Sequence, residues 1–226
     1  MPAAPKLVDE TANAPRTRKG ASSRARLIDA ARQVFEEDGF LDARITDIAE
    51  RAGLGHGTFY HYFDSKEAVL REVAAALADR LVPPVDEAVF TIASDVGPRE
   101  QIRQGTRMYL ERYKKEARLI SEVDRAEHLD VQLQQARREH SRVHAKLVAA
   151  SIRQHQRNGL ADPRLDPNVV AHAMSAIANR FADLWAVQKL IDLSFDAAVD
   201  QLTTLMCNAI GVPDAEASPT RRRAKG

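Results

Sequence analysis

Apolar side chains recur at three- and four-residue intervals along almost the whole chain of 226 residues. This spacing places them on one face of an α-helix, whereas a half-buried strand would alternate polar and apolar residues. We find no segment that alternates in that way. The sequence therefore predicts an all-α protein.

Glycine, proline and capping residues divide this pattern into about nine helices. Ser22 or Ser23 can cap the first helix, and Gly39 ends it. Pro83-Pro84 interrupts the fourth helix, and Pro98 suits the first position of the fifth. The expected helices cover about 22–38, 44–52, 59–63, 65–81, 98–116, 117–128, 130–158, 167–188 and 194–210.

The two ends of the chain differ from the helical part in composition. Residues 1–21 are rich in Pro, Ala, Thr and basic side chains, and the segment after Pro213 is similar. We expect a disordered basic arm at 1–21, a DNA-binding domain at 22–66, a ligand-binding and dimerisation domain at 67–212, and a disordered tail at 213–226.

The formal net charge is only +1, which taken alone argues against a protein that binds nucleic acid. The distribution of charge matters more than its sum. Five basic residues with no acid among them lie near the N-terminus: Arg16, Arg18, Lys19, Arg24 and Arg26. Such a cluster can contact phosphate, although a solvated, disordered tail explains it equally simply.

Composition limits the class of protein. Apolar content is 44% and charged content 29%, which suits a globular protein in water. The single cysteine, Cys207, excludes an internal disulfide and favours a reducing compartment. No stretch approaches the ~18 apolar residues of a membrane span, and the N-terminus lacks the apolar region of a secretory signal. We therefore expect a cytoplasmic protein.

The segment FYHYF, residues 59–63, has aromatic side chains on both sides of a short helix. Phe59 and Phe63 are four residues apart, so they share one side and can pack into a small core. Thr58, His61 and Tyr62 face the other way, with Tyr60 at the edge. A short helix, a glycine-containing turn and a second short helix form a helix-turn-helix, and the two phenylalanines would hold its second helix so that the other face is presented rigidly.

The sequence ITDIAERAGLGHGTFYHYFDSKEAVL, residues 45–70, resembles the DNA-binding segment of the TetR (tetracycline repressor) family of transcriptional regulators. The resemblance is close over about 22–75, and beyond that it extends only to the number and order of helices. It implies a homodimer that pairs through its last two helices, binds a pseudo-palindromic operator in double-stranded DNA, and is released by a small molecule. A repressor is the expected role.

The family's DNA contacts carry over to matching positions of this chain. Thr58 and Gly57 match residues near base edges, His56 and His61 match variable positions that set specificity, and Tyr60, Tyr62 and Lys66 match phosphate contacts. The full expected set is Arg44, Thr46, His56, Gly57, Thr58, Tyr60, His61, Tyr62 and Lys66. Two positions depart from the family pattern: Arg44 stands where most members have Thr or Ser, and Gly55 stands where Ser is common. Both lose a hydroxyl cap, and the Arg44 guanidinium could contact phosphate instead.

The effector is expected to be mainly apolar or amphipathic, because the candidate pocket residues are mostly apolar with a few polar anchors. They could equally fill an ordinary core. The candidates are Met108, Tyr109, Arg112, Tyr113, Ile120, Val123, Leu147, Met174, Ile177, Asn179 and Phe181.

Other signals do not point to catalysis. His140 and His144 have a spacing that can bind zinc, but without a surrounding HExxH pattern we expect ordinary solvated or hydrogen-bonded histidines. No nucleophile, phosphate-binding or dinucleotide-binding motif occurs, so we expect no enzyme activity, no cofactor and no metal. Two alternatives stay open: a helical enzyme or ligand carrier without DNA binding, and a DNA-binding activator or nucleoid-associated protein.

Overall fold

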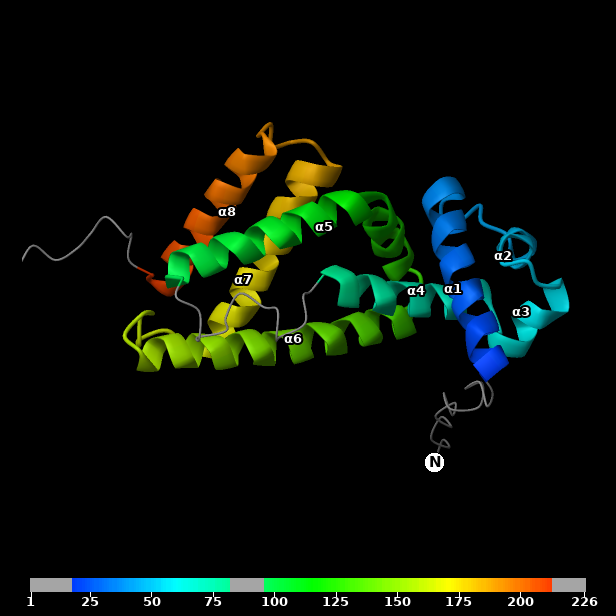
Figure 1. Ribbon diagram of the computed structural model, residues 1–226, viewed down its shortest axis with the longest axis horizontal. Helices are drawn as coiled ribbons and strands as arrows, with labels where there is room; N and C mark the ends of the chain where they lie inside the picture. Colours follow the sequence, from blue (N-terminus) through cyan, green and yellow to red (C-terminus); the bar gives the residue numbers. More distant parts are fainter. Residues whose placement is uncertain (1–17, 82–95, 213–226) are drawn as a thin grey trace, which may run out of the picture. The chain divides into compact units, whose positions relative to one another are not determined.

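A computed structural model describes residues 18–81 and 96–212 of the chain. All regular structure in those residues is helical, which confirms the all-α prediction. The described elements are α1 (Arg18–Asp38), α2 (Ile45–Arg51), α3 (His56–Tyr62), α4 (Lys66–Leu81), α5 (Pro98–Glu127), α6 (Val131–Arg157), α7 (Pro167–Ala182), the π-helical η1 (Asp183–Val187) and α8 (Phe195–Ile210) (Figure 1). None of these helices is long and apolar enough to cross a membrane.

The described residues form two compact units. The first contains the chain up to Leu77 together with Arg118–Ala136, and the second contains Ala78–Ala117 and the chain from Arg137 onward. The end of α5 and the start of α6 therefore belong to the same unit as α1, α2 and α3. The functional boundary expected at residue 66 is a separate matter and stays a prediction.

The first unit is built on the apolar face of α1. Leu27, Ala31, Val34 and Phe35 on that face are fully buried, as their spacing predicted. Helix α1 begins at Arg18, so residues 18–21 are helical rather than part of an arm, and the start expected at Ser22 or Ser23 was wrong. The predicted arm otherwise lies outside the described residues, as do Pro83-Pro84 and the tail after residue 212.

Helix α5 is a single helix of thirty residues, although the sequence analysis divided it in two near residue 117. Residues 114–119 contain neither glycine nor proline, so nothing in their chemistry breaks the helix. The expected boundary near residue 117 coincides with the point at which α5 passes from the second unit, at Ala117, to the first, at Arg118.

The second unit contains α7 and α8, whose ends are set by local chemistry. Asp166 caps α7 by accepting hydrogen bonds from the Asn168 and Val169 amides, and Ser194 caps α8 by accepting from the Ala197 amide. Gly211 ends α8 in the left-handed conformation, with φ 72°. These boundaries agree with those expected from the sequence, except that 183–187 form a π-helical segment.

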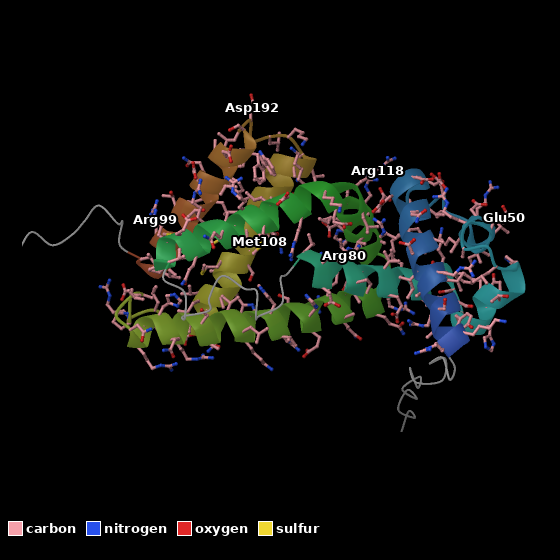
Figure 2. The ribbon with its side chains drawn as sticks, in the orientation of Figure 1. Glu50, Arg80, Arg99, Met108, Arg118 and Asp192 are labelled. Atoms are coloured by element: carbon pink, nitrogen blue, oxygen red, sulfur yellow. The ribbon has the colours of Figure 1, made fainter. Side chains whose placement is uncertain are left out.

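Helices α5 and α8 are joined by a ladder of polar contacts one turn apart. Arg99, labelled in Figure 2, donates to the Thr204 hydroxyl at 3.2 Å. Ion pairs link Arg103 with Asp200 (3.2 Å) and Arg107 with Asp196 (2.6 Å). Because the arginine numbers rise as their partners' numbers fall, the two helices run antiparallel within the second unit.

Candidate DNA-binding surface

Helix α3 presents two chemically different faces. Phe59 and Phe63 are 0% and 3% exposed, so they form the buried side as predicted. Tyr60 is 48% exposed, and His56 and His61 are exposed beside it. Thr58 and Tyr62 are half-buried at the margin of this outer face. The buried phenylalanines therefore hold a polar, aromatic surface facing outward.

Ring contacts order the side chains of that outer face. The His56 and Tyr60 rings meet edge to face with 5.2 Å between centroids, and His61 and Tyr62 do the same at 5.0 Å. Edge-to-face packing is a favourable geometry for aromatic pairs. Each histidine is thus arranged beside a tyrosine before any partner binds.

Gly57 leaves the backbone of α3 open. A Cβ atom built at Gly57 would have no neighbouring atom within 4 Å. The protein's own side chains do not occupy the space beside Gly57, so packing within the fold does not require a glycine at this position. An open backbone allows another molecule to approach closely.

Helix α2 begins without a side-chain cap. Arg44 has the extended conformation of an N-cap residue, but its side chain makes no capping hydrogen bond and is exposed. Thr46, also exposed, donates to the Asp47 carboxylate at 3.2 Å. The Arg44 side chain therefore does not cap the first amides of α2, and the N-terminal end of a helix favours an anion.

Lys66 makes contacts that sequence reasoning missed. Its ammonium donates to the backbone carbonyls of Leu41 and Ala43, each at 2.9 Å, and lies 4.7 Å from the centroid of the Phe40 ring. A lysine ammonium has three hydrogens. The residue thus supports the loop between α1 and α2 with two of these three hydrogens.

Two arginines of the N-terminal basic cluster are bound within the first unit. Arg24 forms an ion pair with Glu72 at 2.7 Å and lies over the Phe63 ring. Arg26 donates to the carbonyls of Ala52 and Gly53. Arg18 and Lys19 are exposed on the first turn of α1, and Arg16 lies outside the described residues.

Arg26 fixes the turn of the helix-turn-helix. Its guanidinium binds carbonyls at the C-terminus of α2, where the helix dipole favours a positive charge. Gly53 has φ 62°, and a Cβ there would lie 2.7 Å from an Arg26 nitrogen. In the sequence, this role corresponds only to an arginine in the first helix and a glycine in the turn after the second helix. That combination is too common to identify the contact.

The predicted effector residues are only partly brought together. In the second unit the Tyr109 hydroxyl donates to the Asn179 side chain at 2.7 Å, and the Tyr109 and Tyr113 rings lie 5.7 Å apart. Arg112 donates to the Arg80 carbonyl. The remaining members of the second unit divide by burial: Met174 is buried, Met108 and Phe181 are half-buried, and Leu147 and Ile177 are exposed.

Ile120 and Val123, the other two effector candidates, are buried in the first unit. They lie on the part of α5 that belongs to the same unit as α1, α2 and α3. His140 and His144, in the second unit, have one carboxylate nearby: Asp79 lies 4.0 Å from the first imidazole. No group of three or more potential ligands in 18–81 and 96–212 has the arrangement of a metal site.

Comparison with known proteins locates the similarity in the first unit. Residues 27–73 match the family model "Bacterial regulatory proteins, tetR family". Over 63 residues, 28% of this chain and 32% of the relative, the sequence is 41% identical to the HTH-type transcriptional regulator YdgC of Bacillus subtilis. Over 66 residues, 29% of this chain and 32% of the relative, it is 38% identical to the HTH-type transcriptional repressor KstR2 of Rhodococcus jostii.

These alignments span about a third of the length of each curated relative. Both relatives are named as transcriptional regulators rather than enzymes. The fold similarity extends further: the transcriptional regulator FadR of Bacillus subtilis, solved in complex with stearoyl-CoA, superimposes with a TM-score of 0.66 over 82% of this chain and 98% of that one, at 17% identity. The segment that contains α2 and α3 therefore matches the tetR family of bacterial regulatory proteins, and most of the chain shares the all-α fold of a solved transcriptional regulator.

Proposed function

We propose that this protein is a cytoplasmic transcriptional repressor that binds a pseudo-palindromic DNA operator as a homodimer and is released by a small molecule. The observation that carries the proposal is that α3 has one buried apolar face and one exposed polar face. Phe59 is fully buried while Tyr60 and His61 beside it are exposed, so the helix presents polar groups that the fold does not use. An exposed, rigid helix of this kind fits the major groove.

The exposed groups have distinct roles in this proposal. Tyr60, Tyr62 and the remaining donor of Lys66 contact phosphate oxygens, and such contacts position the protein without reading sequence. Thr58 and His61 lie where base edges would be read. Gly57 allows the backbone of α3 to come close to the duplex, because no side chain stands between them.

One helix-turn-helix makes few contacts, so a dimer is needed for tight and specific binding. Helices α7 and α8 carry exposed apolar side chains suited to pairing: Val169, Ile177 and Leu205. Leu202, on the same helix as Leu205, is 1% exposed and belongs to the core of one protomer. We therefore assign pairing to the face with Leu205 and not to Leu202.

The effector site of the proposal lies in the second unit around Tyr109 and Asn179. Tyr109 is bonded to Asn179 and lies next to the Tyr113 ring, and apolar Met108 and Met174 belong to the same two helices. The neighbouring fold of FadR was solved with stearoyl-CoA, a ligand with a long apolar chain. Together these support a mainly apolar or amphipathic effector.

Selection of bound sequences from a random pool of double-stranded DNA tests this function. We expect an inverted repeat with half-site centres about 34–36 Å apart, or a larger multiple of the helical repeat. Thr58→Ala should change the selected bases, whereas Tyr60→Phe should weaken binding to all sequences and lower the salt dependence. Failure of the wild-type dimer to enrich any sequence would reject the proposal.

A further inference from the structure

The loop between α1 and α2 is held by a carboxylate from a distant part of the chain. We infer that Glu122 is a positioning residue for DNA binding: its carboxylate fixes this loop, and through the loop the start of α2. The inference rests on the proposed function, because it assigns a purpose to the position of α2. Glu122 itself is not expected to touch DNA.

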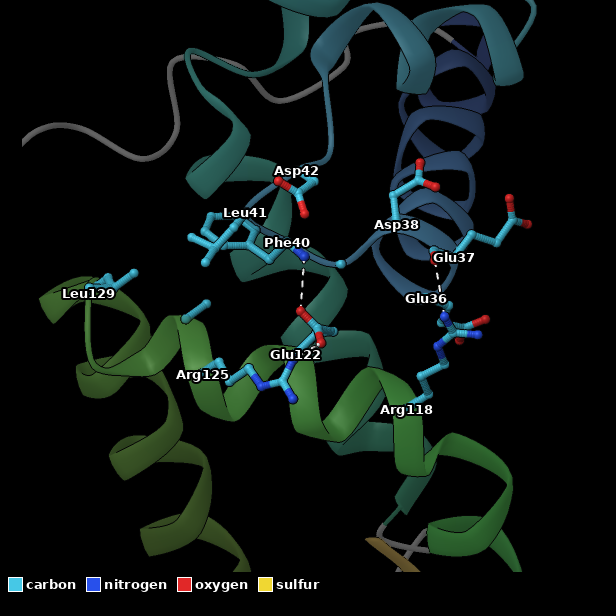
Figure 3. A pocket seen from close by; sticks show the side chains of 12 residues that line it. Glu36, Glu37, Asp38, Phe40, Leu41, Asp42, Arg118, Glu122, Arg125 and Leu129 are labelled. Carbon is cyan, nitrogen blue, oxygen red and sulfur yellow. Dashed lines mark hydrogen bonds and ion pairs between the residues drawn. The ribbon is translucent and has the colours of Figure 1, made fainter.

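The contact is short and largely shielded from water. Glu122 Oε2 accepts a hydrogen bond from the Phe40 amide at 3.0 Å, and Glu122 Oε1 pairs with Arg125 Nη1 at 2.7 Å (Figure 3). The Glu122 side chain is only 12% exposed. A hydrogen bond to an ionised carboxylate is stronger than one between neutral groups, and burial strengthens it further.

The backbone next to Phe40 is shaped to admit this carboxylate. Gly39 has φ 83°, a conformation that other residues rarely adopt. A Cβ atom at Gly39 would lie 3.2 Å from Glu122 Oε2, tighter than an ordinary contact. The sequence thus places glycine where both the turn and the approach of Glu122 require it.

Other side chains hold the rest of the same segment. Arg118, one turn before Glu122 on α5, donates to the Glu37 carbonyl at 3.0 Å (Figure 3). Lys66 donates to the Leu41 and Ala43 carbonyls. Residues 37–43 are therefore fixed from α5 on one side and from α4 on the other. The segment leads directly into Arg44, the N-cap of α2.

This support matters because α2 cannot fix its own start. The helix has seven residues, and Arg44 makes no capping hydrogen bond with its side chain. Short helices depend on tertiary contacts for stability. Once Phe40 is released, Arg44 and Thr46 lose a constraint on their position, and these are residues assigned to the DNA contact.

Charged side chains surround the Glu122 carboxylate. A cavity of about 310 Å³ lies beside it, bounded by Phe40, Leu41, Ala126 and Leu129 and by several further carboxylates of the α1 end. Arg125, which is paired with Glu122, and Arg118 supply positive charge among these carboxylates.

Two substitutions separate the carboxylate's role from mere packing. Glu122→Gln keeps an oxygen acceptor for the Phe40 amide, whereas Glu122→Leu keeps the volume and removes the acceptor. We expect Glu122→Leu to speed hydrogen exchange of the Phe40 amide, measured by NMR, and to weaken binding to the selected operator about tenfold. Glu122→Gln should retain most of the protection and bind within about threefold of the wild type. Glu111→Leu, at an exposed carboxylate of the same helix, is the matched control and should change neither.

A second variant covers the case in which Glu122→Leu does not fold. Arg125 is largely exposed, so Arg125→Ala should fold, and loss of the counter-charge should increase Phe40 exchange with a smaller fall in affinity. The role of Glu122 would be overturned if Glu122→Leu bound the operator as tightly as the wild type. If Glu122→Leu does not fold, unchanged Phe40 exchange and unchanged operator affinity in Arg125→Ala would overturn it. If the wild-type protein selects no DNA sequence, the proposed function is rejected instead, whatever the hydrogen-exchange rate of the Phe40 amide.

Discussion

Helices α3 and α8 reach stability by different routes. Helix α8 has sixteen residues, a serine cap at its start and a left-handed glycine at its end, so its own sequence satisfies its terminal groups. Helix α3 has seven residues and begins at Gly55, which offers no capping side chain. It is held mainly by burying Phe59 against its neighbours in the first unit. A helix fixed from one side by two aromatics can leave its other side free for a partner.

The same contrast explains where similarity to known proteins is found. A short helix fixed by tertiary contacts needs particular residues at particular positions, and the segment 27–73 that contains it matches a family model. A capped, amphipathic helix can be made from many sequences. Two solved structures that align with 80–84% of the chain share its fold at only 17–21% identity.

The largest expected effect compares the two cores directly. Phe59→Ala should lower the free energy of unfolding of the first unit by about 3–5 kcal/mol, because a fully buried ring leaves a cavity in a small core. Leu202→Ala should cost the second unit about 2–5 kcal/mol for the same reason. Trp185, the only tryptophan of the chain, is buried in the second unit, so its fluorescence reports that unit while circular dichroism reports all helices.

The contrast between the two units fails if Phe59→Ala and Leu202→Ala destabilise both units alike. We expect Phe59→Ala to abolish operator binding and to leave the fluorescence transition of Trp185 nearly unchanged. Tyr60→Ala, at an exposed neighbour on the same helix, is the control and should alter stability little. A Phe59→Ala protein whose Trp185 transition falls as far as that of Leu202→Ala would show that the units unfold together.

A charge on the exposed face of α8 should affect assembly rather than folding. Leu205 is 47% exposed in the protomer, so Leu205→Glu should leave the thermal transition of the second unit nearly intact. Burying an unpaired carboxylate in a dimer interface is costly, and we expect the dimer to dissociate at micromolar concentration. Sedimentation measures this. A Leu205→Glu protein that stays dimeric would place the interface elsewhere.

Two glycines should respond in opposite directions. Gly53→Ala should destabilise the first unit by roughly 1–2 kcal/mol, because φ is 62° and the new Cβ would meet Arg26. Gly57→Ala should stabilise it by roughly 0.5–1 kcal/mol, since the helix gains a better residue in open space.

The second substitution carries the functional test. If the backbone at Gly57 approaches DNA, the stabilised Gly57→Ala protein binds its operator more weakly, as a titration of labelled operator would show. Tighter binding together with higher stability would mean that Gly57 serves no contact. The pair thus separates a glycine required by the fold from one required by the partner.

Sequence reasoning succeeded where local chemistry decides the structure. The faces of α1 and α3 followed from residue spacing, and the starts of α7 and α8 agree with the expected ranges, where Asp166 and Ser194 cap the helices. It failed where partners are distant in the sequence. The bonds of Lys66 to the loop before α2, of Arg26 to the turn after α2, and of Glu122 to Phe40 join residues between 23 and 82 positions apart. No periodicity within one helix encodes such a pairing.

The smallest expected effect concerns pH and the second unit alone. Burial lowers the pKa of His144 below its ordinary 6.5, and neighbouring His140 lowers it further. The folded state therefore favours the neutral imidazole, so its contribution to stability is present above about pH 6.5 and is lost as the pH falls below that value. Asp162 does not interfere in this range, because hydrogen bonds from Arg164 lower its pKa to about 2.

We expect the Trp185 melting temperature to fall slightly between pH 7.5 and pH 5.5 in the wild type and to fall less in His144→Gln. The difference between the two proteins isolates His144 from the other histidines. An identical pH dependence in wild type and His144→Gln would mean that the imidazole is as well solvated in the folded unit as in the unfolded chain. Burial of His144 would then contribute nothing to the pH dependence of the second unit's stability.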